Sequence, residues 1–292
     1  MELFALDIIT KEDLEESITR LAYEESNSAI MTEFIKNDII KITVYGSDDT
    51  LSNIKNKINS FIKDFYNCDN IDSFVKYYQY VLENTDWSEK WKSEFNPIEL
   101  KDIAVTPYFK DYTGNIKRVI TINPSVGFGS GEHETTQLML EKISELNING
   151  KKVLDIGSGS GILSIAAILF GAKEALMIEI DKDAGNNSKE NFELNNMLNK
   201  FSLIVGDFAE STVREKIKSK YEVILLNILP NIIIKLLPYI DYFLSEKGEL
   251  IISGVVEERY TEIINSVKNN NFIIKSTAKK NNWIRLDCIK KI

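Results

Sequence analysis

Two hydrophobic patterns divide the chain. From residue 152 onward, nearly continuous apolar runs alternate with helical segments, at residues 153–156, 175–180, 202–205, 223–227 and 249–253. Such runs are typical of parallel strands covered on both faces, and they predict a doubly wound α/β sheet of the Rossmann-like kind. Ligands bind beyond the carboxyl ends of the strands in such sheets, so the loops that follow the strands are where chemistry is expected.

The first 85 residues follow a different pattern. Strand-like runs alternate with amphipathic helices, at residues 3–9, 10–23, 39–45, 51–65 and 75–82. Thr10 is the expected N-cap of the first helix, because an acidic turn follows it. Read as strand, helix, two strands, helix and strand, this order predicts a small α+β domain of the ferredoxin-like type. No catalytic cleft is visible in its sequence, so we interpret it as a binding module.

Between the two patterns lies an aromatic segment. Trp87, Trp91 and Phe95 recur at helical spacing before Pro97, and proline ends a helix. We interpret residues 86–100 as a helix that joins the domains, with its aromatic stripe packed between them. The chain then has a recognition domain at 1–85, the linker helix at 86–100 and a larger domain at 101–292.

Charge limits the possible partners. The 292 residues carry 35 Lys and Arg and 44 Asp and Glu, a formal net charge of −9. Residues 1–85 hold 16 of the acidic and 8 of the basic side chains, so most of the excess lies there. The negative charge argues against direct nucleic-acid binding, which needs clustered Lys and Arg. The negative electrostatic field of residues 1–85 attracts a basic partner. A surface that is acidic only for solubility explains the charge equally well.

The sequence offers no anchor and no metal site. No apolar run approaches the roughly 18 to 20 residues that cross a bilayer, and the acidic start is unlike a signal peptide. We therefore expect a cytoplasmic monomer with no membrane partner. Cys68 and Cys288 lie far apart without metal-binding spacing, so neither a metal nor a disulfide is expected.

A glycine-rich loop follows the first strand of the larger domain. Asp155, Gly157, Gly159 and Gly161 belong to Asp-Ile-Gly-Ser-Gly-Ser-Gly, directly before a helix expected at 162–170. Glycines at such a turn allow the backbone to approach a ligand closely. The loop alone fits a nicotinamide nucleotide as well as S-adenosyl-L-methionine. The acidic Asp155 and the absence of a Walker-type Lys-Ser/Thr favour S-adenosylmethionine.

Polar side chains also end the next strands. Glu179 ends the second strand, where a carboxylate accepts hydrogen bonds from both ribose hydroxyls, and Asp181 is expected to cap the next helix. Asp207 follows the third strand and is a candidate contact to adenine, with a plain loop aspartate as the alternative. Asn227 ends the fourth strand. Its amide oxygen, with a backbone carbonyl, can accept the N–H bonds of an amine and aim the lone pair at a methyl group, so Asn227 is a candidate for both catalysis and cofactor binding.

A glycine-rich segment with the only histidine, residues 123–136, precedes these motifs. We expect a flexible lid that leads into a helix at 137–143, with Thr135 or Thr136 as the cap and Thr136 also as a cofactor contact. His133 is a candidate proton acceptor, because the unperturbed pKa of imidazole lies near neutrality. A structural histidine is the alternative.

Together these segments resemble the ribosomal protein L11 methyltransferase (PrmA) family. The matching pieces occur in family order, at residues 87–92, 128–136, 155–167, 227–229 and 252–254. The resemblance implies a class I methyltransferase fold, S-adenosyl-L-methionine as cofactor, and methylation of lysine or N-terminal amino groups of a basic ribosomal protein. It also places Thr136, Gly157, Glu179 and Asn227 at the family's cofactor-binding positions, with Asn227 beside the target amine.

Three positions depart from the family pattern. Glu134 stands where the lid usually has proline, Ser158 where the glycine loop has Cys or Thr, and Glu179 where an Asp is usual. Glu179 keeps the charge on a longer arm, so the ribose contact is expected to survive. Residues 1–85 match the family only in size and order of elements. The alternatives therefore include the same chemistry on another protein, a nicotinamide-dependent oxidoreductase and a non-catalytic ribosome-assembly binder.

Overall fold

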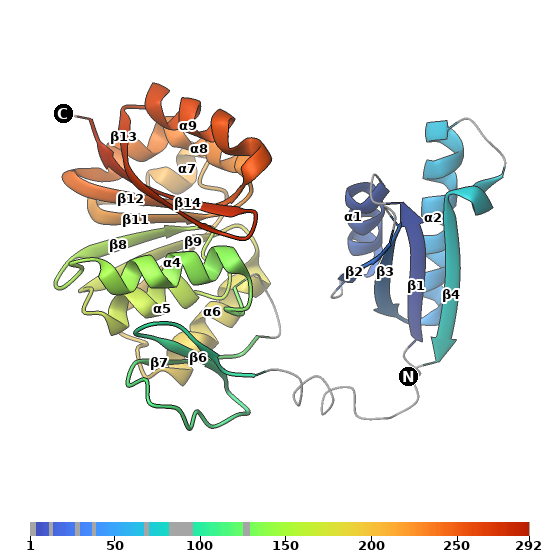
Figure 1. The fold of residues 1–292 in the computed structure, drawn as a ribbon, viewed down its shortest axis with the longest axis horizontal. Helices are drawn as coiled ribbons and strands as arrows, with labels where there is room; N and C mark the ends of the chain where they lie inside the picture. Colours follow the sequence, from blue (N-terminus) through green and yellow to red (C-terminus); the bar gives the residue numbers. More distant parts are fainter. Residues whose placement is uncertain are drawn as a thin grey trace. The chain divides into compact units, whose positions relative to one another are not determined.

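The computed structural model describes residues 4–11, 14–26, 30–36, 39–66, 70–81, 96–124 and 129–291 (Figure 1). The chain divides into two compact units, residues 1–91 and 92–292. Cys68 and most of the expected linker helix, with its three aromatic residues, lie outside the described residues. The end of that segment is a strand instead of a helix, β5 (Ile98–Glu99). No helix in the described ranges is long and apolar enough to cross a membrane.

The N-terminal unit has the ferredoxin-like arrangement that the sequence predicts. Its elements are β1 (Phe4–Lys11), α1 (Glu15–Ser26), β2 (Ile30–Lys36), β3 (Ile39–Gly46), α2 (Asp48–Tyr66), a short 3-10 helix (Ile71–Ser73) and β4 (Val75–Val81). The sheet has the order β2-β3-β1-β4 and is antiparallel throughout. Leu6 and Ile8 of β1 share one buried core with Ile18 of α1 and Ile54 and Ile58 of α2. Alternate residues of the strands therefore face the helices.

Two details of this unit differ from expectation. Thr10 does not cap α1, because it lies in β1 and its hydroxyl donates to the carbonyl oxygen of Phe74 at 3.0 Å. Strand β2, for which no residue range was predicted, lies at the edge of the sheet. Met31 and Phe34 in it are 51% and 63% exposed, so the strand lacks the buried alternation by which strands are recognised.

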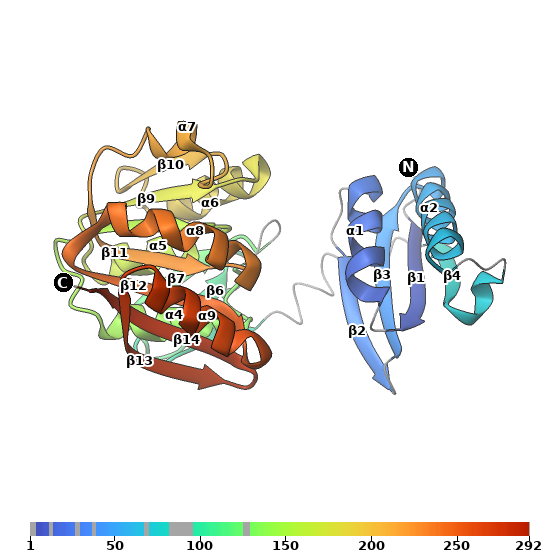
Figure 2. The same ribbon diagram turned by 90° about the horizontal axis from the view of Figure 1, so that it is seen from above.

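The C-terminal unit is a doubly wound α/β domain. Its elements are β5, β6 (Ala104–Pro107), β7 (Val119–Ile122), α4 (Glu134–Glu145), β8 (Lys152–Ile156), α5 (Ile162–Leu169), β9 (Glu174–Glu179), α6 (Lys182–Leu194), β10 (Phe201–Val205), α7 (Ser211–Arg214), β11 (Tyr221–Asn227), α8 (Pro230–Phe243), β12 (Leu244–Val256), a 3-10 turn (Glu257–Arg259), α9 (Tyr260–Asn269), β13 (Phe272–Lys280) and β14 (Trp283–Lys290). Its main sheet has the order β10-β9-β8-β11-β12-β14-β13, which Figure 2 shows from one edge to the other. The first five of these strands are parallel, as predicted, and the antiparallel hairpin β13–β14 extends them.

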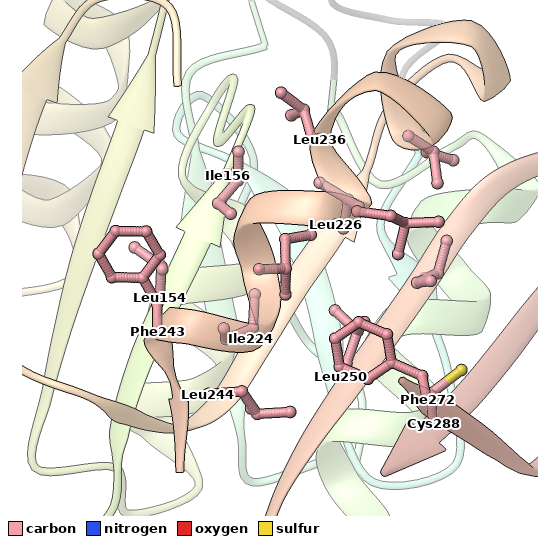
Figure 3. Close-up of a cluster of buried hydrophobic side chains, with 14 of the residues drawn as sticks. Leu154, Ile156, Ile224, Leu226, Leu236, Phe243, Leu244, Leu250, Phe272 and Cys288 are labelled. Atoms are coloured by element: carbon pink, nitrogen blue, oxygen red, sulfur yellow. The ribbon is translucent and has the colours of Figure 1, made fainter. Parts of the chain in front are cut away.

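Helices cover both faces of this sheet, with α4, α5 and α6 on one side and α8 and α9 on the other (Figure 1). Leu154, Ile224 and Leu250 of three neighbouring strands pack with Phe243 of α8 in one core (Figure 3). The intervening Val153, Val223 and Ile251 belong to a second core with α4 and α5. Both faces of each strand are therefore buried, which explains the continuous apolar runs. Only the ends of the strands remain accessible to a ligand.

Candidate active site

The strand exits that carry the predicted residues lie at one edge of the main sheet. Strand β8 is central, and the chain moves outward from it to β9 and β10 on one side and to β11 and β12 on the other. Ile156 pairs with Ile178 of β9 and with Leu226 of β11, so the glycine loop, Glu179 and Asn227 follow at the same level. This reversal of strand order is where α/β sheets bind their ligands.

The glycine loop turns sharply from β8 into α5. Gly157, Gly159 and Gly161 all have positive φ angles, of 74°, 51° and 77°, a conformation that favours glycine. At Gly157 the absence of a side chain is also a matter of space. A Cβ there would lie 2.4 Å from Cγ2 of Ile228, the residue after Asn227. The glycine therefore lets the exits of β8 and β11 approach each other closely.

Glu179 fastens this loop to the end of β9. Its Oε2 accepts a hydrogen bond from the Gly159 amide at 2.7 Å, and its Oε1 accepts one from the Asp181 amide at 3.1 Å. The residue is buried, with 8% of its surface exposed. An ionised carboxylate has about four lone-pair sites, so capacity remains for ribose hydroxyls. The bond to the loop was not anticipated from the sequence. Asp181 caps α6 as expected, accepting from the Asp183 amide at 2.8 Å.

Asp155 is buried below the loop, 1% exposed. Its Oδ2 accepts a hydrogen bond from the Ser164 hydroxyl at 2.7 Å. Burial raises the pKa of Asp155 to about 7, against the opposing effect of the Ser164 hydrogen bond. Near neutral pH this carboxyl therefore exists in both forms, and it can either donate to a ligand or accept from one.

Asn227 stands at the exit of β11, held in place by the residue that follows it. The side chain of Ile228 lies over Gly157, and its carbonyl oxygen would lie 2.2 Å from a Cβ at Gly254. Gly254 itself has a φ of 82° in β12. Ile228 therefore lies between two glycines, with its side chain against Gly157 and its backbone against Gly254. These contacts hold the backbone next to Asn227 and so fix the direction in which the Asn227 side chain leaves the strand.

The start of α4 reaches the same edge of the sheet. Trp283, which pairs with Val256 at the end of β12, packs edge-on against His133 with ring centroids 4.7 Å apart. His133 is the N-cap of α4, and its Nδ1 accepts a hydrogen bond from the Thr135 amide at 3.2 Å. The expectation that Thr135 or Thr136 caps this helix was therefore wrong. An imidazole ring can fill the cap because its neutral nitrogen is an acceptor, as a serine oxygen is.

This cap bears on the predicted role of His133 as a base. Burial lowers the pKa of His133, which favours the neutral ring. A neutral ring whose Nδ1 accepts a hydrogen bond carries its proton on Nε2. Proton uptake by His133 would therefore compete with the cap of α4. The base role stays a prediction.

Glu134 and the hairpin β13–β14 secure the same helix end. The Glu134 carboxylate accepts a hydrogen bond from Nδ2 of Asn281, in the turn of the hairpin, at 2.7 Å. Arg285 of β14 donates to the carbonyl oxygen of Leu138 at 2.7 Å. The glutamate that replaces the usual lid proline thus has a specific partner, 147 residues further along the chain.

Asp207 is half-exposed at the end of β10. Its Oδ1 accepts a hydrogen bond from the Ala209 amide at 2.8 Å, and its Oδ2 lies 3.5 Å from Nζ of Lys235. The neighbouring Gly206 amide donates to the carbonyl oxygen of Glu179 at 2.8 Å. Asp207 therefore lies next to the exit of β9, on the side expected for adenine. Its contact to the base stays a prediction.

Buried oxygens without a partner gather at these exits. In the described part of the chain six buried side-chain oxygens lack a hydrogen-bond partner, and four of them are Thr136 Oγ1, Asp155 Oδ1, Ser158 Oγ and Asn227 Oδ1. Each such group costs about 1 to 3 kcal/mol, a cost that a polar ligand relieves. S-adenosylmethionine, with its ammonium, carboxylate, hydroxyl and amine groups, fits this donor and acceptor set. Ser158 was not predicted as a site residue, although its place between two loop glycines was a signal.

A family model described as ribosomal protein L11 methyltransferase (PrmA) matches residues 5–291 of the chain. The chain belongs to this family. A ribosomal protein L11 methyltransferase of Dictyoglomus thermophilum is 31% identical over 301 residues, which cover 97% of each chain. One from Ruminiclostridium cellulolyticum is 32% identical over 256 residues, 87% of this chain and 80% of its own. A crystal structure of ribosomal protein L11 methylase from Lactobacillus delbrueckii subsp. bulgaricus is similar with a TM-score of 0.61 and 29% identity, covering 68% of this chain and all of that one.

As a member of the PrmA family, the chain is an S-adenosylmethionine-dependent methyltransferase. The oxidoreductase alternative is not favoured. The match begins at residue 5, and the Dictyoglomus thermophilum relative aligns over 97% of this chain, so the sequence of the N-terminal unit also matches the family. The expectation that residues 1–85 match it only in size and order of elements was wrong.

Proposed function

We propose that this PrmA-family enzyme transfers methyl groups to lysine and N-terminal amino groups of ribosomal protein L11. The names of its relatives support the substrate. The observation that carries the chemistry is the buried, unpartnered Oδ1 of Asn227 at the strand exit beside the glycine loop. It is an acceptor held ready for an N–H group that the chain itself does not provide.

The cofactor-binding residues are proposed from the same edge. The backbone at Gly157 and Gly159 cradles S-adenosylmethionine, Glu179 accepts from its ribose, and Asp207 contacts its adenine. Thr136 and Asp155 satisfy the amino-acid end with their buried oxygens. The bound cofactor supplies an electrophilic methyl group on a cationic sulfonium.

Asn227 orients the amine. A primary amine attacks only as the neutral form, with its lone pair directed at the methyl carbon. By accepting one N–H bond, the Asn227 amide fixes the amine in this direction without forming a covalent intermediate. His133 is proposed to take the proton that a lysine ammonium must lose, if the α4 cap releases its Nδ1.

The N-terminal unit is proposed to dock the substrate. Its helices cover only one face of the sheet, and Asp7, Glu33, Tyr78 and Tyr80 occupy strand positions that face away from the helices. Tyr78 and Tyr80 are 56% and 42% exposed. Lys41 lies on the same face and forms an ion pair with Glu33 at 2.8 Å, so the two tyrosines and Asp7 are the groups that suit a basic protein surface. We propose domain limits of 1–85, 86–100 and 101–292 and a cytoplasmic monomer without direct nucleic-acid contact.

The proposal is tested by offering the enzyme a choice. Purified enzyme is incubated with methyl-labelled S-adenosylmethionine and a mixture of all large-subunit ribosomal proteins from cells that lack the enzyme, so that the target amines are unmethylated. We expect the label in L11 alone, on lysine and terminal amines by mass spectrometry. Label in another protein, with L11 unmodified, would overturn the substrate and keep the chemistry.

A further inference from the structure

Three asparagines form a row along one face of α6 and its C-cap, which is Asn195. Asn187, Asn191 and Asn195 follow each other at intervals of four residues, so they share a side of the helix. Asn195 holds β7 by accepting from the Thr121 amide at 3.0 Å and donating to the Thr121 carbonyl oxygen at 2.6 Å. Asn187 donates to the carbonyl oxygen of Asn123 at 3.1 Å. The row thus bonds to the end of β7 as a neighbouring strand would.

Of the three asparagines, Asn191 is the one whose side chain is bonded to the glycine loop. Oδ1 of Asn191 accepts from the Asn123 amide at 2.7 Å, while its Nδ2 donates to the carbonyl oxygen of Ser160 at 2.8 Å. Asn191 is completely buried. It therefore links the end of β7 to the glycine loop through a single side chain.

Ser160 continues this link on its other side. Its hydroxyl donates to the carbonyl oxygen of Gly129 at 2.8 Å, again in a buried position. Gly129 has a φ of 111°, and a Cβ there would lie 2.7 Å from the Ser160 oxygen. Asn123 and Gly129, six positions apart in the sequence, are both joined to the glycine loop by this pair of residues.

The loop itself is thereby held from two directions. The Gly159 amide is bonded to Glu179 at the end of β9, and the next residue, Ser160, is bonded to Asn191 of α6. Gly161 packs on the same helix, where a Cβ would lie 3.1 Å from Cβ of Ser188. Two successive residues of the glycine loop, Gly159 and Ser160, are therefore hydrogen-bonded to two different elements, the end of β9 and helix α6.

We propose that Asn191 and Ser160 are positioning residues that set the conformation of the glycine loop for the cofactor. The inference rests on the proposed cofactor site. Neither residue needs to touch the cofactor. Asn191 acts through Ser160, and its loss frees the loop backbone next to Gly159, so that part of the binding free energy is spent on ordering it again.

Asn195 supplies the matched control. Asn191→Ala and Asn195→Ala each remove an amide from the same face of α6 and from bonds to the same end of β7, but only the first breaks the bond to the loop. We expect Asn191→Ala to weaken S-adenosylhomocysteine binding about 10-fold in isothermal titration, against less than about 2-fold for Asn195→Ala. Both variants should lower the Tm by similar amounts. Equal loss of affinity in the two, or none in Asn191→Ala, overturns the inference.

Two further variants address the case in which Asn191→Ala does not fold. Asn191→Asp keeps an acceptor for the Asn123 amide and, when ionised, loses the donor to Ser160. Ser160→Ala loses the hydroxyl that donates to Gly129 and accepts from the Ile162 amide at 3.4 Å, and it keeps the Ser160 carbonyl that Asn191 bonds. Both should raise the KM for S-adenosylmethionine several-fold and leave the KM for the protein substrate unchanged, and a rise in both KM values or in neither contradicts the inference. Wild-type enzyme is titrated alongside. If it does not bind S-adenosylhomocysteine, the proposed cofactor site fails, whereas wild-type binding with equal variants removes this inference alone.

Discussion

The two units of the chain bury their sheets in different ways, and this difference determines where each can bind a partner. In the N-terminal unit helices cover one face of a four-stranded sheet, so the other face offers broad contact to a large molecule. In the C-terminal unit helices cover both faces, so only the ends of the strands remain for a ligand. A face suits recognition of a protein surface, whereas an edge lined with buried polar atoms suits a small molecule and the chemistry done on it. The predictions below test this division of work.

The largest effect is expected at the edge, from Asn227→Ala. Loss of the acceptor leaves the amine without orientation, so we expect kcat to fall about 100-fold, roughly 2.7 kcal/mol of barrier. The Kd for S-adenosylhomocysteine should change much less, because the amine is held only during transfer. Asn231→Ala is the control, since Asn231 is an asparagine of α8 bonded to Arg259 at an exposed site. Unchanged turnover in Asn227→Ala would remove its catalytic role.

Gly157→Ala tests the close approach of the strand exits. The new Cβ would lie 2.4 Å from Ile228 Cγ2, so either the loop or the Asn227 exit must shift. We expect cofactor affinity to fall more than about 10-fold. Gly150→Ala separates this effect from backbone strain, because Gly150 has a φ of 72° but a Cβ added there would meet nothing within 4 Å. It should cost about 1 kcal/mol of stability and leave affinity intact, and equal affinity loss in both variants would contradict the spatial argument.

Asp155→Asn should change how stability depends on pH. The pKa of Asp155 is about 7 in the folded protein and 3.8 in an unperturbed side chain. The folded state therefore binds the extra proton, and wild-type stability falls as pH rises from about 4 to about 7. The variant lacks this fall, so its stability relative to wild type should be about 2 kcal/mol more favourable at pH 8 than at pH 5. Urea unfolding of the cofactor-free protein at both pH values measures it, and a difference that does not vary with pH would show that Asp155 titrates normally.

The smallest effect is expected on the open face of the N-terminal unit. Tyr78→Ala should raise the KM for the ribosomal protein about 5-fold, roughly 1 kcal/mol, and leave cofactor affinity unchanged. Tyr242→Ala, at a tyrosine of α8 that is 73% exposed and so more accessible than Tyr78, should change neither quantity. A higher KM for the cofactor in Tyr78→Ala, or the same KM change in both variants, would mean that the two units do not divide the work in this way.

The sequence predicts those parts of the structure that follow from a local hydrophobic pattern, and it misses those that depend on contacts between distant residues. The parallel strands were predicted because both of their faces are buried and their apolar runs are continuous. The hairpin β13–β14 was not, because Arg285 and Asp287 interrupt its pattern. Those charges are buried at 6% and 3% exposure, and they are tolerated because they bond to each other and because Lys142 lies 3.1 Å from Asp287. Such pairing arises only in the folded state.

The site shows the same division. The glycine loop, Glu179 and Asn227 stand at strand ends, which the sequence locates. The bonds of Asn191 depend on residues that meet only after folding, because its partners are 31 and 68 positions away. The cap of α4 is local, between His133 and Thr135, and it was missed because histidine is not among the usual N-cap residues. Asparagines on a helix read as solvated surface, so no local signal marked Asn191 as part of the loop's support.

The hydrogen bond from Arg285 in hairpin β13–β14 to helix α4 has a consequence for folding during translation. Leu138 is synthesised 147 residues before Arg285, its partner in β14. At roughly 5 to 20 residues per second, translation separates them by about 7 to 30 seconds. During that interval the beginning of α4, with Thr136 and His133, has emerged without the strand that supports it, so a nascent chain acquires its complete methyl-donor pocket only late in its own synthesis.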